Sequence, residues 1–513
     1  MKRKVLSLML SAAMVFSLFA CGQNDVPSTS SESKVVEAQT SETKESTPQV
    51  AEEPKEIREV TWLTIGDQPE DFDKVIEATN EILRERYALE LNMIQVASNE
   101  LVTRSELMIT SGEDFDLMYV NKKTFDPNVA REAFLPLDDL LENSEIGKKL
   151  MEVYPEGLAD FAIRKGATYA LPNYQMIYTQ PAAYVQKNLA EEYGLDLNAT
   201  YNTIVDLEPF MDWVLANKKD IWPLAESGVL SQAFGADKSL DNWSEAVATQ
   251  YNACFKADGS IDVELAWTQE ADIKIARMWN TYFKKGYLRS DLATVTDNSA
   301  DLLAGRYAIV TSGNKPYGEV DLSTKYGIEF VRIPLGTPYI QYNGPVATMT
   351  AVNVNSKNPE AALEMLYVMW TDEEVVNMLN YGLEGEHYKK ISADRVETID
   401  GSKYTNTTLG WQLGNQFIVW KMQGQEDDIY DLTLELNANA IQSPLKGFQM
   451  DTSNVSTELS LFNAANKEVG SGYKYAEDFD AWLANAVATL KAACGAELEA
   501  EYQKQIDAWL ATK

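Results

Sequence analysis

An alternation of apolar runs and amphipathic segments between residues 60 and 120 constrains the fold of this 513-residue chain more than any other feature. Val60–Ile65 is a continuous apolar and β-branched run, which is typical of a buried parallel strand. Helical spacing of apolar residues follows after Pro69 and again in Glu100–Thr110, and strand-like runs lie at Leu89–Met93 and Phe115–Val120. This order predicts an α/β fold, with a mostly parallel sheet flanked by helices.

Ligands bind open parallel sheets beyond the carboxyl ends of the strands. In the predicted sheet, Thr64–Gln68 and Tyr119–Lys122 lie at such ends. We therefore expect polar side chains of these two segments to lie close to a ligand.

Composition excludes several classes of protein. The formal net charge of −34 would repel nucleic acid over most of the surface, so we expect no nucleic-acid partner. The single histidine, His387, cannot build a His-rich metal centre and leaves one possible imidazole base, and we expect neither a metal nor a cofactor. Three cysteines without a Cys-x-x-Cys pair cannot form a disulfide framework.

The N-terminal residues have the features of a lipoprotein signal peptide. Three basic residues precede the apolar run Val5–Phe19, which is shorter than the roughly 20 residues that a membrane-spanning helix needs. Leu18–Gly22 resembles the bacterial lipobox, in which a cysteine, here Cys21, receives diacylglycerol. We expect residues 1–20 to be the signal peptide and residues 21–56, which are polar and lack aromatic side chains, to be a disordered tether to the membrane.

Short motifs in a fixed order give the rest of the chain a family resemblance. They are Trp62–Asp67, Ser111–Asp116, Phe134–Leu140, Thr168–Pro172, Gly305–Ala308 and Asn358–Ala362. Their order resembles that of ABC-transporter solute-binding proteins of the sugar-binding family 1 group. A second set resembles the large Gram-positive lipoprotein branch of that group, which has a DUF3502-like C-terminal region: Asn380–Tyr388, Gly414–Phe417, Gly447–Phe448, Asp451–Ser453 and Gln505–Trp509.

The resemblance implies a two-lobe, class II periplasmic-binding-protein-like fold, in which hinge segments join two α/β lobes around a ligand cleft. We expect lobe one at residues 57–172 plus 343–388 and lobe two at residues 173–342 plus 389–513. It also implies a function outside the cell membrane: capture of a sugar or oligosaccharide and its delivery, unchanged, to the permease subunits of an ABC importer. Such a protein is not an enzyme, and we expect a lipid-anchored monomer.

Candidate binding residues follow from the chemistry of sugars, whose CH faces stack on aromatic rings while their hydroxyls bond to planar polar groups. Loop-like segments combine the two at Tyr174 beside Asn173, at Trp222, at Trp243, at Tyr317 and at Trp411 beside Gln412. By position after strands, the resemblance adds Thr64, Asp67, Gln68 and Asn121. Asp67 is as well suited to a turn or helix cap beside Gly66.

Other conspicuous residues are expected to be structural. Trp62, Trp279, Trp482 and Trp509 follow strand or helix periodicity, which predicts that they pack in cores. His387 lies in the motif Glu384–Tyr388 with Gly385, close to Gly382, and we interpret this glycine-containing segment as a hinge element rather than a ligand site.

Two other classes of function stay open at this point. A surface glycosidase is possible because 78 acidic residues can supply a catalytic carboxylate pair. No phosphate-loop, dinucleotide or His-x-x-x-His motif supports an enzyme, however. The third class is a lipid-anchored peptide-binding or sensor protein.

Overall fold

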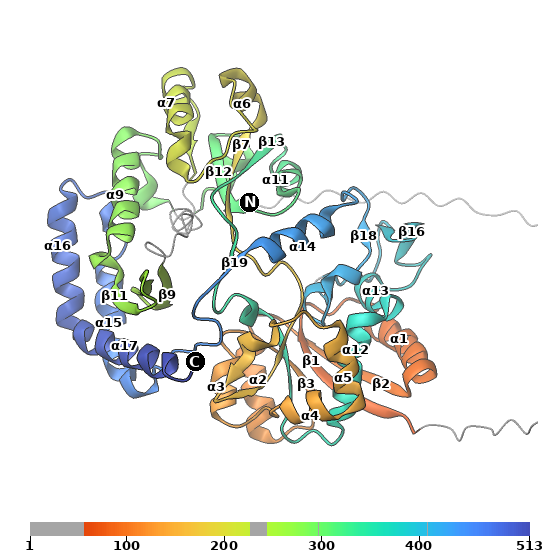
Figure 1. The fold of residues 1–513 in the computed structure, drawn as a ribbon. Helices are drawn as coiled ribbons and strands as arrows, with labels where there is room; N and C mark the ends of the chain where they lie inside the picture. The colour runs from red at the N-terminus through yellow and green to blue at the C-terminus, as the bar shows by residue number, and fades with distance from the viewer. Residues whose placement is uncertain (1–55, 226–243, 296, 408) are drawn as a thin grey trace, which may run out of the picture. The chain divides into compact units, whose positions relative to one another are not determined.

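The computed structural model describes residues 56–225, 244–295, 297–407 and 409–513. Figure 1 traces these residues, which build a five-stranded, a four-stranded and a three-stranded sheet together with three two- or three-stranded ribbons. The predicted signal peptide, Cys21, the tether up to residue 55 and the candidate Trp243 lie outside the described residues.

The first sheet has the strand order β2-β1-β3-β15-β6. Its strands are β1 (Arg58–Ile65), β2 (Leu89–Val96), β3 (Leu117–Val120), β6 (Leu171–Pro172) and β15 (Met349–Val352). The helices of this part are α1 (Phe72–Tyr87), α2 (Leu101–Ser111), α3 (Phe125–Ala130), α4 (Asp138–Asn143), α5 (Glu145–Val153), α12 (Pro359–Thr371) and α13 (Glu373–Tyr381). The order from β1 to β3 confirms the predicted strand and helix alternation. The strands β4 (Ile163–Arg164) and β5 (Ala167–Thr168) form a separate ribbon.

Local sequence explains why α1 joins β1 to β2 as a parallel crossover. Asp73 lies in the first turn of α1, and Arg84 and Arg86 lie in its last turn, so all three charges are favourable for the helix dipole. The helix ends at Ala88, which has a left-handed φ of 52° and turns the chain directly into β2. β1 then pairs in parallel with both β2 and β3, so the carboxyl ends of the three strands lie on one edge.

The first core extends further along the chain than predicted. Residues 389–440 were expected in lobe two, but Val396, Tyr404, Leu409 and Trp420 pack in the core of the first sheet. This segment contains β16 (Tyr388–Ser392), β17 (Arg395–Thr398), β18 (Lys421–Met422) and α14 (Ile429–Asn439). The reason is that the apolar side chains of this segment pack against α13. The 3-10 turn Leu409–Trp411 lies beside that helix.

The second sheet has the order β13-β7-β12-β8 and its own core. Its strands are β7 (Pro181–Gln186), β8 (Trp222–Leu224), β12 (Tyr307–Gly313) and β13 (Phe330–Pro334). The helices beside it are α6 (Lys187–Tyr193), α7 (Glu208–Asn217), α9 (Glu270–Lys285), α10 (Ser299–Leu303) and α11 (Gly318–Tyr326). Trp279 is buried in this core and Trp62 in the first, as expected for both.

A third core joins two segments that are far apart in the sequence. The strands β9 (Ser244–Ala248), β10 (Tyr251–Phe255) and β11 (Ile261–Leu265) form an antiparallel sheet. The helices α15 (Ser456–Val469), α16 (Phe479–Leu490) and α17 (Ala496–Leu510) pack with it, and Figure 1 draws them in blue beside the green strands. Trp482 and Trp509 are partly buried here, in agreement with their predicted packing role.

Three passages of chain connect the first sheet with the rest. One runs from β6 to β7, a second from β13 to β15 through β14 (Tyr339–Ile340), and a third follows α14 through β19 (Ile441–Gln442). β14 pairs in parallel with β19, and Thr179 exchanges backbone hydrogen bonds of 2.7 and 2.9 Å with Tyr339. Backbone hydrogen bonds therefore join the second passage to both the first and the third.

Candidate ligand-binding site

The candidate site begins with one row of side chains at the carboxyl edge of the first sheet. Thr350 pairs with Tyr119, and Thr64 and Tyr119 directly follow the paired residues Leu63 and Met118, so the three side chains lie on one face. Thr64 and Thr350 are fully buried, and neither hydroxyl has a hydrogen-bond partner among the described residues. The Tyr119 hydroxyl donates to the Ala347 carbonyl at 3.3 Å, and burial raises the pKa of Tyr119 to about 12.

The loop after the 3-10 turn η6 (Leu409–Trp411) lies against this edge. The half-buried Trp411 ring meets the Tyr119 ring edge to face, with centroids 6.3 Å apart. The Gln412 side chain accepts a hydrogen bond from the Ile65 amide at 3.1 Å, and the Gln412 carbonyl accepts one from Asn173 Nδ2 at 2.5 Å. Gln412 thus ties the end of β1 to the start of the passage that leaves β6.

Tyr174 belongs to an aromatic cluster beside the same loop. Its ring stacks on Trp370 at a centroid distance of 6.2 Å and meets Phe417 edge to face at 4.9 Å. Phe417 contacts Tyr430 of α14 in turn, at 5.7 Å. Partial burial raises the pKa of Tyr174, so its phenol stays a neutral hydrogen-bonding group. The structure therefore brings Thr64, Asn173, Tyr174 and Trp411 together, as a candidate site requires.

The remaining strand-end residues divide into exposed and structural positions. Asp67 and Gln68 follow β1 and are exposed to solvent. Asn121 follows β3, and its side-chain Oδ1 accepts a hydrogen bond from the Lys123 backbone N–H at 2.9 Å, while the Asn121 backbone N–H donates to Thr124 Oγ1 at 3.0 Å. Asn121 therefore has a structural role in the turn that starts α3.

A cavity of about 260 Å³ lies just beyond Asn121. Lys122 and Asp126 from the first sheet's side, Tyr342 and Asn343 from the second passage, and Thr249 and Met450 from the third core line it. The Lys122 ammonium donates to Asn343 Oδ1 at 2.9 Å, and partial burial lowers the pKa of Lys122. Burial raises the pKa of Asp126, which is paired with Arg164 at 2.7 Å.

Trp222 lies away from these residues. It starts β8, where its ring packs on Tyr307 at 5.3 Å and lies under the guanidinium of Arg289 at 5.0 Å. β12 runs from Tyr307 to Gly313, about 20 Å at about 3.3 Å per residue, and only its far end leads to the first passage, where Asn314 bonds to Gln180. The pairing of β8 with the start of β12 therefore removes Trp222 from the candidate site.

Tyr317 follows β12 and is nearer to the aromatic cluster. Its hydroxyl donates to Asp428 Oδ1 at 2.7 Å, two residues before Tyr430 in the sequence. Hydrogen bonding to that carboxylate raises the pKa of Tyr317 to about 12. With a φ of 58°, Tyr317 also starts α11 in a left-handed conformation. The structure thus does not bring the candidate binding residues Trp222 and Tyr317 together.

Comparison with known proteins assigns the family. The sequence matches the bacterial extracellular solute-binding protein family over residues 66–375, which is more than half of the chain. The chain belongs to this family. Residues 444–511, which include α15 to α17 of the third core, match DUF3502, a domain of unknown function.

Similar proteins agree with this assignment. A carbohydrate ABC transporter substrate-binding protein of Streptococcus pneumoniae is 25% identical over 411 residues, which cover 78% of this chain and 80% of the relative. The crystal structure of the N-glycan transport solute-binding protein NgtS of S. pneumoniae matches with a TM-score of 0.74 and 21% identity, over 88% of this chain and 99% of NgtS. An HMO-binding, ABC-transporter-associated solute-binding protein from Bifidobacterium longum infantis has a TM-score of 0.57 and 13% identity, over 88% of this chain and 99% of that one. The predicted family and two-lobe fold are confirmed.

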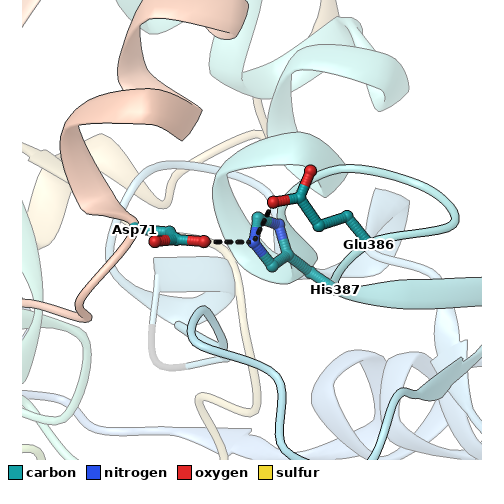
Figure 2. Close-up of side chains that lie close together, drawn as sticks. All are labelled: Asp71, Glu386 and His387. Carbon is teal, nitrogen blue, oxygen red and sulfur yellow. Dashed lines mark hydrogen bonds and ion pairs between the residues drawn. The ribbon is translucent and has the colours of Figure 1, made fainter. Parts of the chain in front are cut away.

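A cluster of possible metal ligands in this solute-binding protein has a different explanation. Figure 2 shows Asp71 and Glu386 beside the buried His387, whose Nε2 lies 3.1 Å from Asp71 Oδ2 and 3.8 Å from Glu386 Oε1. His387 Nδ1 accepts a hydrogen bond from the Leu383 amide at 2.9 Å, so the proton of the neutral ring is on Nε2 and points to Asp71. A metal ion bound to Nε2 would take the place of that proton. The proton of the neutral ring would then be on Nδ1, which could no longer accept the hydrogen bond from Leu383. The geometry therefore favours a structural role for His387, which joins Asp71 to Leu383 by hydrogen bonds.

The location of this cluster also corrects one prediction. Gly382 and Gly385 were expected in a hinge, but the segment that holds them follows α13, and Tyr381 and Tyr388 on either side pack in the first core. Backbone reversal inside one lobe explains the two glycines. Within the described ranges, no helix combines the length and the apolar character that crossing a membrane requires.

Proposed function

We propose that this solute-binding protein captures a sugar or oligosaccharide at the carboxyl edge of its first sheet and passes it unchanged to the permease of an ABC importer. The observation that carries the proposal is the half-buried Trp411 ring, held over Tyr119 and next to the polar side chain of Gln412. An aromatic face beside a planar amide matches the two needs of a sugar ring, since its CH face stacks and its hydroxyls form hydrogen bonds.

Names of related proteins support the same ligand class. The S. pneumoniae relative is named a carbohydrate ABC transporter substrate-binding protein, and NgtS was crystallised in complex with Man1GlcNAc and with Man5GlcNAc. Exposed Asp67 and Gln68 after β1 and Lys122 at the cavity beyond β3 would extend the site along the sheet edge. A site of that extent suits several sugar units better than one.

Ligand release would depend on the three passages that leave the first sheet. In hinged two-lobe proteins a few residues of the connecting segments absorb the change in backbone angles, and the ligand favours whichever state it binds more tightly. We place the hinge in residues 173–180 and in the segments around β14 and β19, which pair with one another. If the two lobes close around a sugar, the radius of gyration measured by X-ray scattering should be smaller with ligand than without it.

The binding test is calorimetry with a panel of oligosaccharides that includes Man5GlcNAc. Replacing Trp411 with Ala is expected to weaken the tightest ligand by about tenfold or more, which corresponds to about 1.4 kcal/mol of lost stacking. Trp222→Ala is the matched control, because it removes an indole of similar exposure that lies away from the site. The affinity of this variant for the same oligosaccharide is expected to stay within about twofold of wild type. Equal losses in the two variants would contradict the assignment of the site.

Binding without reaction is part of the proposal. After long incubation of the protein with the tightest oligosaccharide, mass spectrometry of the sugar should detect the starting compound alone. Accumulation of shorter sugars would instead indicate a glycosidase, and the receptor function would then be wrong.

The cellular setting is also proposed from the N-terminal sequence. The lipobox-like Leu18–Gly22 and the polar residues 21–56 support a lipid anchor on Cys21, with the protein as a monomer on the outer face of a Gram-positive cell membrane. Mass spectrometry of the native N-terminal peptide should find a diacylglyceryl group on Cys21. A mature N-terminus without that modification would rule out the anchor.

A further inference from the structure

One cation at the carboxyl edge of the first sheet has no charged partner in the described part of the chain. The Lys122 ammonium donates a hydrogen bond to the neutral Oδ1 of Asn343 at 2.9 Å. No carboxylate of the described residues forms an ion pair with it, and its pKa is lowered by burial without any effect of a nearby charge. Since an ammonium group has three N–H donors, two remain for a ligand.

Lys122 and Asn343 both line the cavity of about 260 Å³ beyond β3. Lys122 is exposed, and its hydrogen bond with Asn343 also lies at the surface, so a solute can reach the pair. Thr249, Gln449 and Thr452 add hydroxyl and amide groups to the wall. The volume is slightly below the roughly 300–1,000 Å³ of small-molecule sites, so the cavity suits one unit of a longer ligand.

A carboxylate in the same wall is already neutralised. Asp126 lines the cavity, but Arg164 Nε donates to its Oδ1 at 2.7 Å. The Arg164 side chain is only 7% exposed and also donates to the carbonyls of Phe161 and Ile163, which hold it in place. Among the described residues that line the cavity, Lys122 is therefore the one whose charge is not compensated.

The turn that carries Lys122 is fixed by its own hydrogen bonds. The Lys123 backbone N–H donates to Asn121 Oδ1 at 2.9 Å, and the Asn121 backbone N–H donates to Thr124 Oγ1 at 3.0 Å. Only the Lys122 side chain is then left to be ordered by a ligand. A preorganised backbone lowers the entropy cost of binding, which favours affinity.

The cavity adjoins the proposed sugar site. Val346 lines it, and the next residue, Ala347, accepts the hydrogen bond of the Tyr119 hydroxyl at 3.3 Å. Lys122 comes three residues after Tyr119, so their Cα atoms are at most about 11 Å apart. A glycan unit stacked on Trp411, whose ring meets Tyr119, therefore leaves a neighbouring unit within reach of Lys122.

A carboxylate is the ligand group that matches an uncompensated ammonium, because the charge-assisted hydrogen bonds between them are shorter and stronger than neutral ones. The net charge of −34 opposes this only weakly, since charges more than about 8 Å away are largely screened at physiological salt. We infer that Lys122 makes the protein selective for acidic glycans, by binding the carboxylate of a uronic or sialic acid unit in this cavity. The inference rests on the proposed function, because it names the kind of sugar that the same site takes.

The test is calorimetry of the full chain with two matched pairs of sugars, trigalacturonate with its methyl ester and sialyllactose with lactose. At least one acid should bind about fivefold or more tightly than its neutral counterpart at about 50 mM salt, and about 500 mM salt should reduce this preference. Lys122→Met keeps the aliphatic stem. It should remove the preference and leave the affinity for the neutral sugar within about twofold of wild type. The pair that shows the preference distinguishes a uronic from a sialic acid unit.

Lys123→Met is the matched control. It removes the same charge from the adjacent exposed lysine, which is not among the residues that line the cavity, and it should keep the preference. Unchanged melting temperatures of both variants exclude misfolding as a cause.

Three results would overturn the inference. These are equal affinity of the wild type for the acidic and neutral members of both pairs, a preference that survives Lys122→Met, or a preference that Lys123→Met also removes. In each case, sugar binding that depends on Trp411 leaves the proposed function intact. No binding of any sugar, acidic or neutral, would instead contradict the proposed function itself.

Discussion

Close packing and an unusual backbone conformation coincide at Gly382. This residue ends α13 with a φ of +84° and a ψ of −140°, a region that side chains rarely adopt. A Cβ added there would lie 2.4 Å from His387 Nδ1. The imidazole cannot move away without losing its hydrogen bonds to Leu383 and Asp71.

We therefore expect Gly382→Ala to lower the free energy of unfolding by about 3 kcal/mol or more, from strain and overpacking together. Gly385→Ala is the matched control, because Gly385 also has a positive φ, of +79°, but a Cβ added there would meet no atom of the described residues within 4 Å. Its cost should be about 1 kcal/mol. Urea denaturation of the two variants measures the difference, and equal costs would contradict the packing argument.

Asp272 makes stability depend on pH in a predictable direction. Its pKa is about 6 in the folded chain against an ordinary value of 3.8, so between these values the folded state binds more protons than the unfolded state. Stability from this residue is therefore lost as the pH rises through that window. Asp272→Asn cannot ionise, and its stability relative to wild type should increase by about 1 to 2 kcal/mol from pH 4 to pH 7. Thermal unfolding at both pH values measures this, and a constant difference would be the contrary result.

At the scale of elements, one side chain of α14 holds the first passage in place. Asn437 is buried, and its Oδ1 accepts hydrogen bonds from the amides of Ile177 at 3.0 Å and Tyr178 at 3.3 Å. Its Nδ2 donates to the Gln175 carbonyl at 2.8 Å. The conformation of the passage is therefore determined by a helix more than 250 positions later.

Asn437→Ala should remove all three hydrogen bonds and lower the free energy of unfolding by about 2 to 4 kcal/mol, because backbone groups would be left unpaired. Amides of residues 175–178 should then exchange hydrogen faster in mass spectrometry. Asn439→Ala, at an exposed position of the same helix, should change neither quantity. Unaltered exchange of the passage in Asn437→Ala would mean that other contacts hold it.

Elements with local periodicity were predictable, and elements defined by distant partners were not. Burial on both faces of β1 and the apolar stripe of α1 are visible in the sequence itself. Residues 389–440 were placed in the wrong lobe, because their periodicity does not reveal which core their apolar side chains fill. Likewise, the sequence around Trp222 has the composition of a binding loop, but its pairing with Tyr307 at the start of β12 decides its location.

The candidate site was predictable only in part for the same reason. Asn173, Tyr174 and Trp411 are near-neighbours of polar residues in loop-like sequence, and the structure brings them together. The buried hydroxyl of Thr350 was missed as a member, because only strand register across the sheet aligns Thr350 with Tyr119. The expected contacts of Asp67, Gln68 and Asn121 with ligand stay predictions.

At the scale of the whole molecule, the described residues contain three large cores, and in the third, aromatic contacts join the strands to the covering helices. Phe462 of α15 is fully buried and packs on Tyr251 of β10 at 5.3 Å. Phe462→Ala should cost about 3 to 5 kcal/mol of stability in this core. Hydrogen exchange should accelerate in β9–β11 while the peptides of β1 and β3 keep their protection.

Leu461→Ala is the control for that prediction, since the neighbouring Leu461 is 55% exposed and should tolerate the change. Equal acceleration in the first sheet and the third core of Phe462→Ala would mean that the cores unfold as one cooperative unit.

The separation of the third core's two segments along the chain has a consequence during biosynthesis. The strands end at Leu265 and the covering helices begin at Ser456, so the ribosome adds about 190 residues between them. At a synthesis rate of about 5 to 20 residues per second, the apolar face of the sheet β9–β11 stays uncovered for about 10 to 40 seconds. Slowing translation after residue 265 should therefore increase aggregation of nascent chains, and a chaperone that binds exposed apolar surface should reduce it.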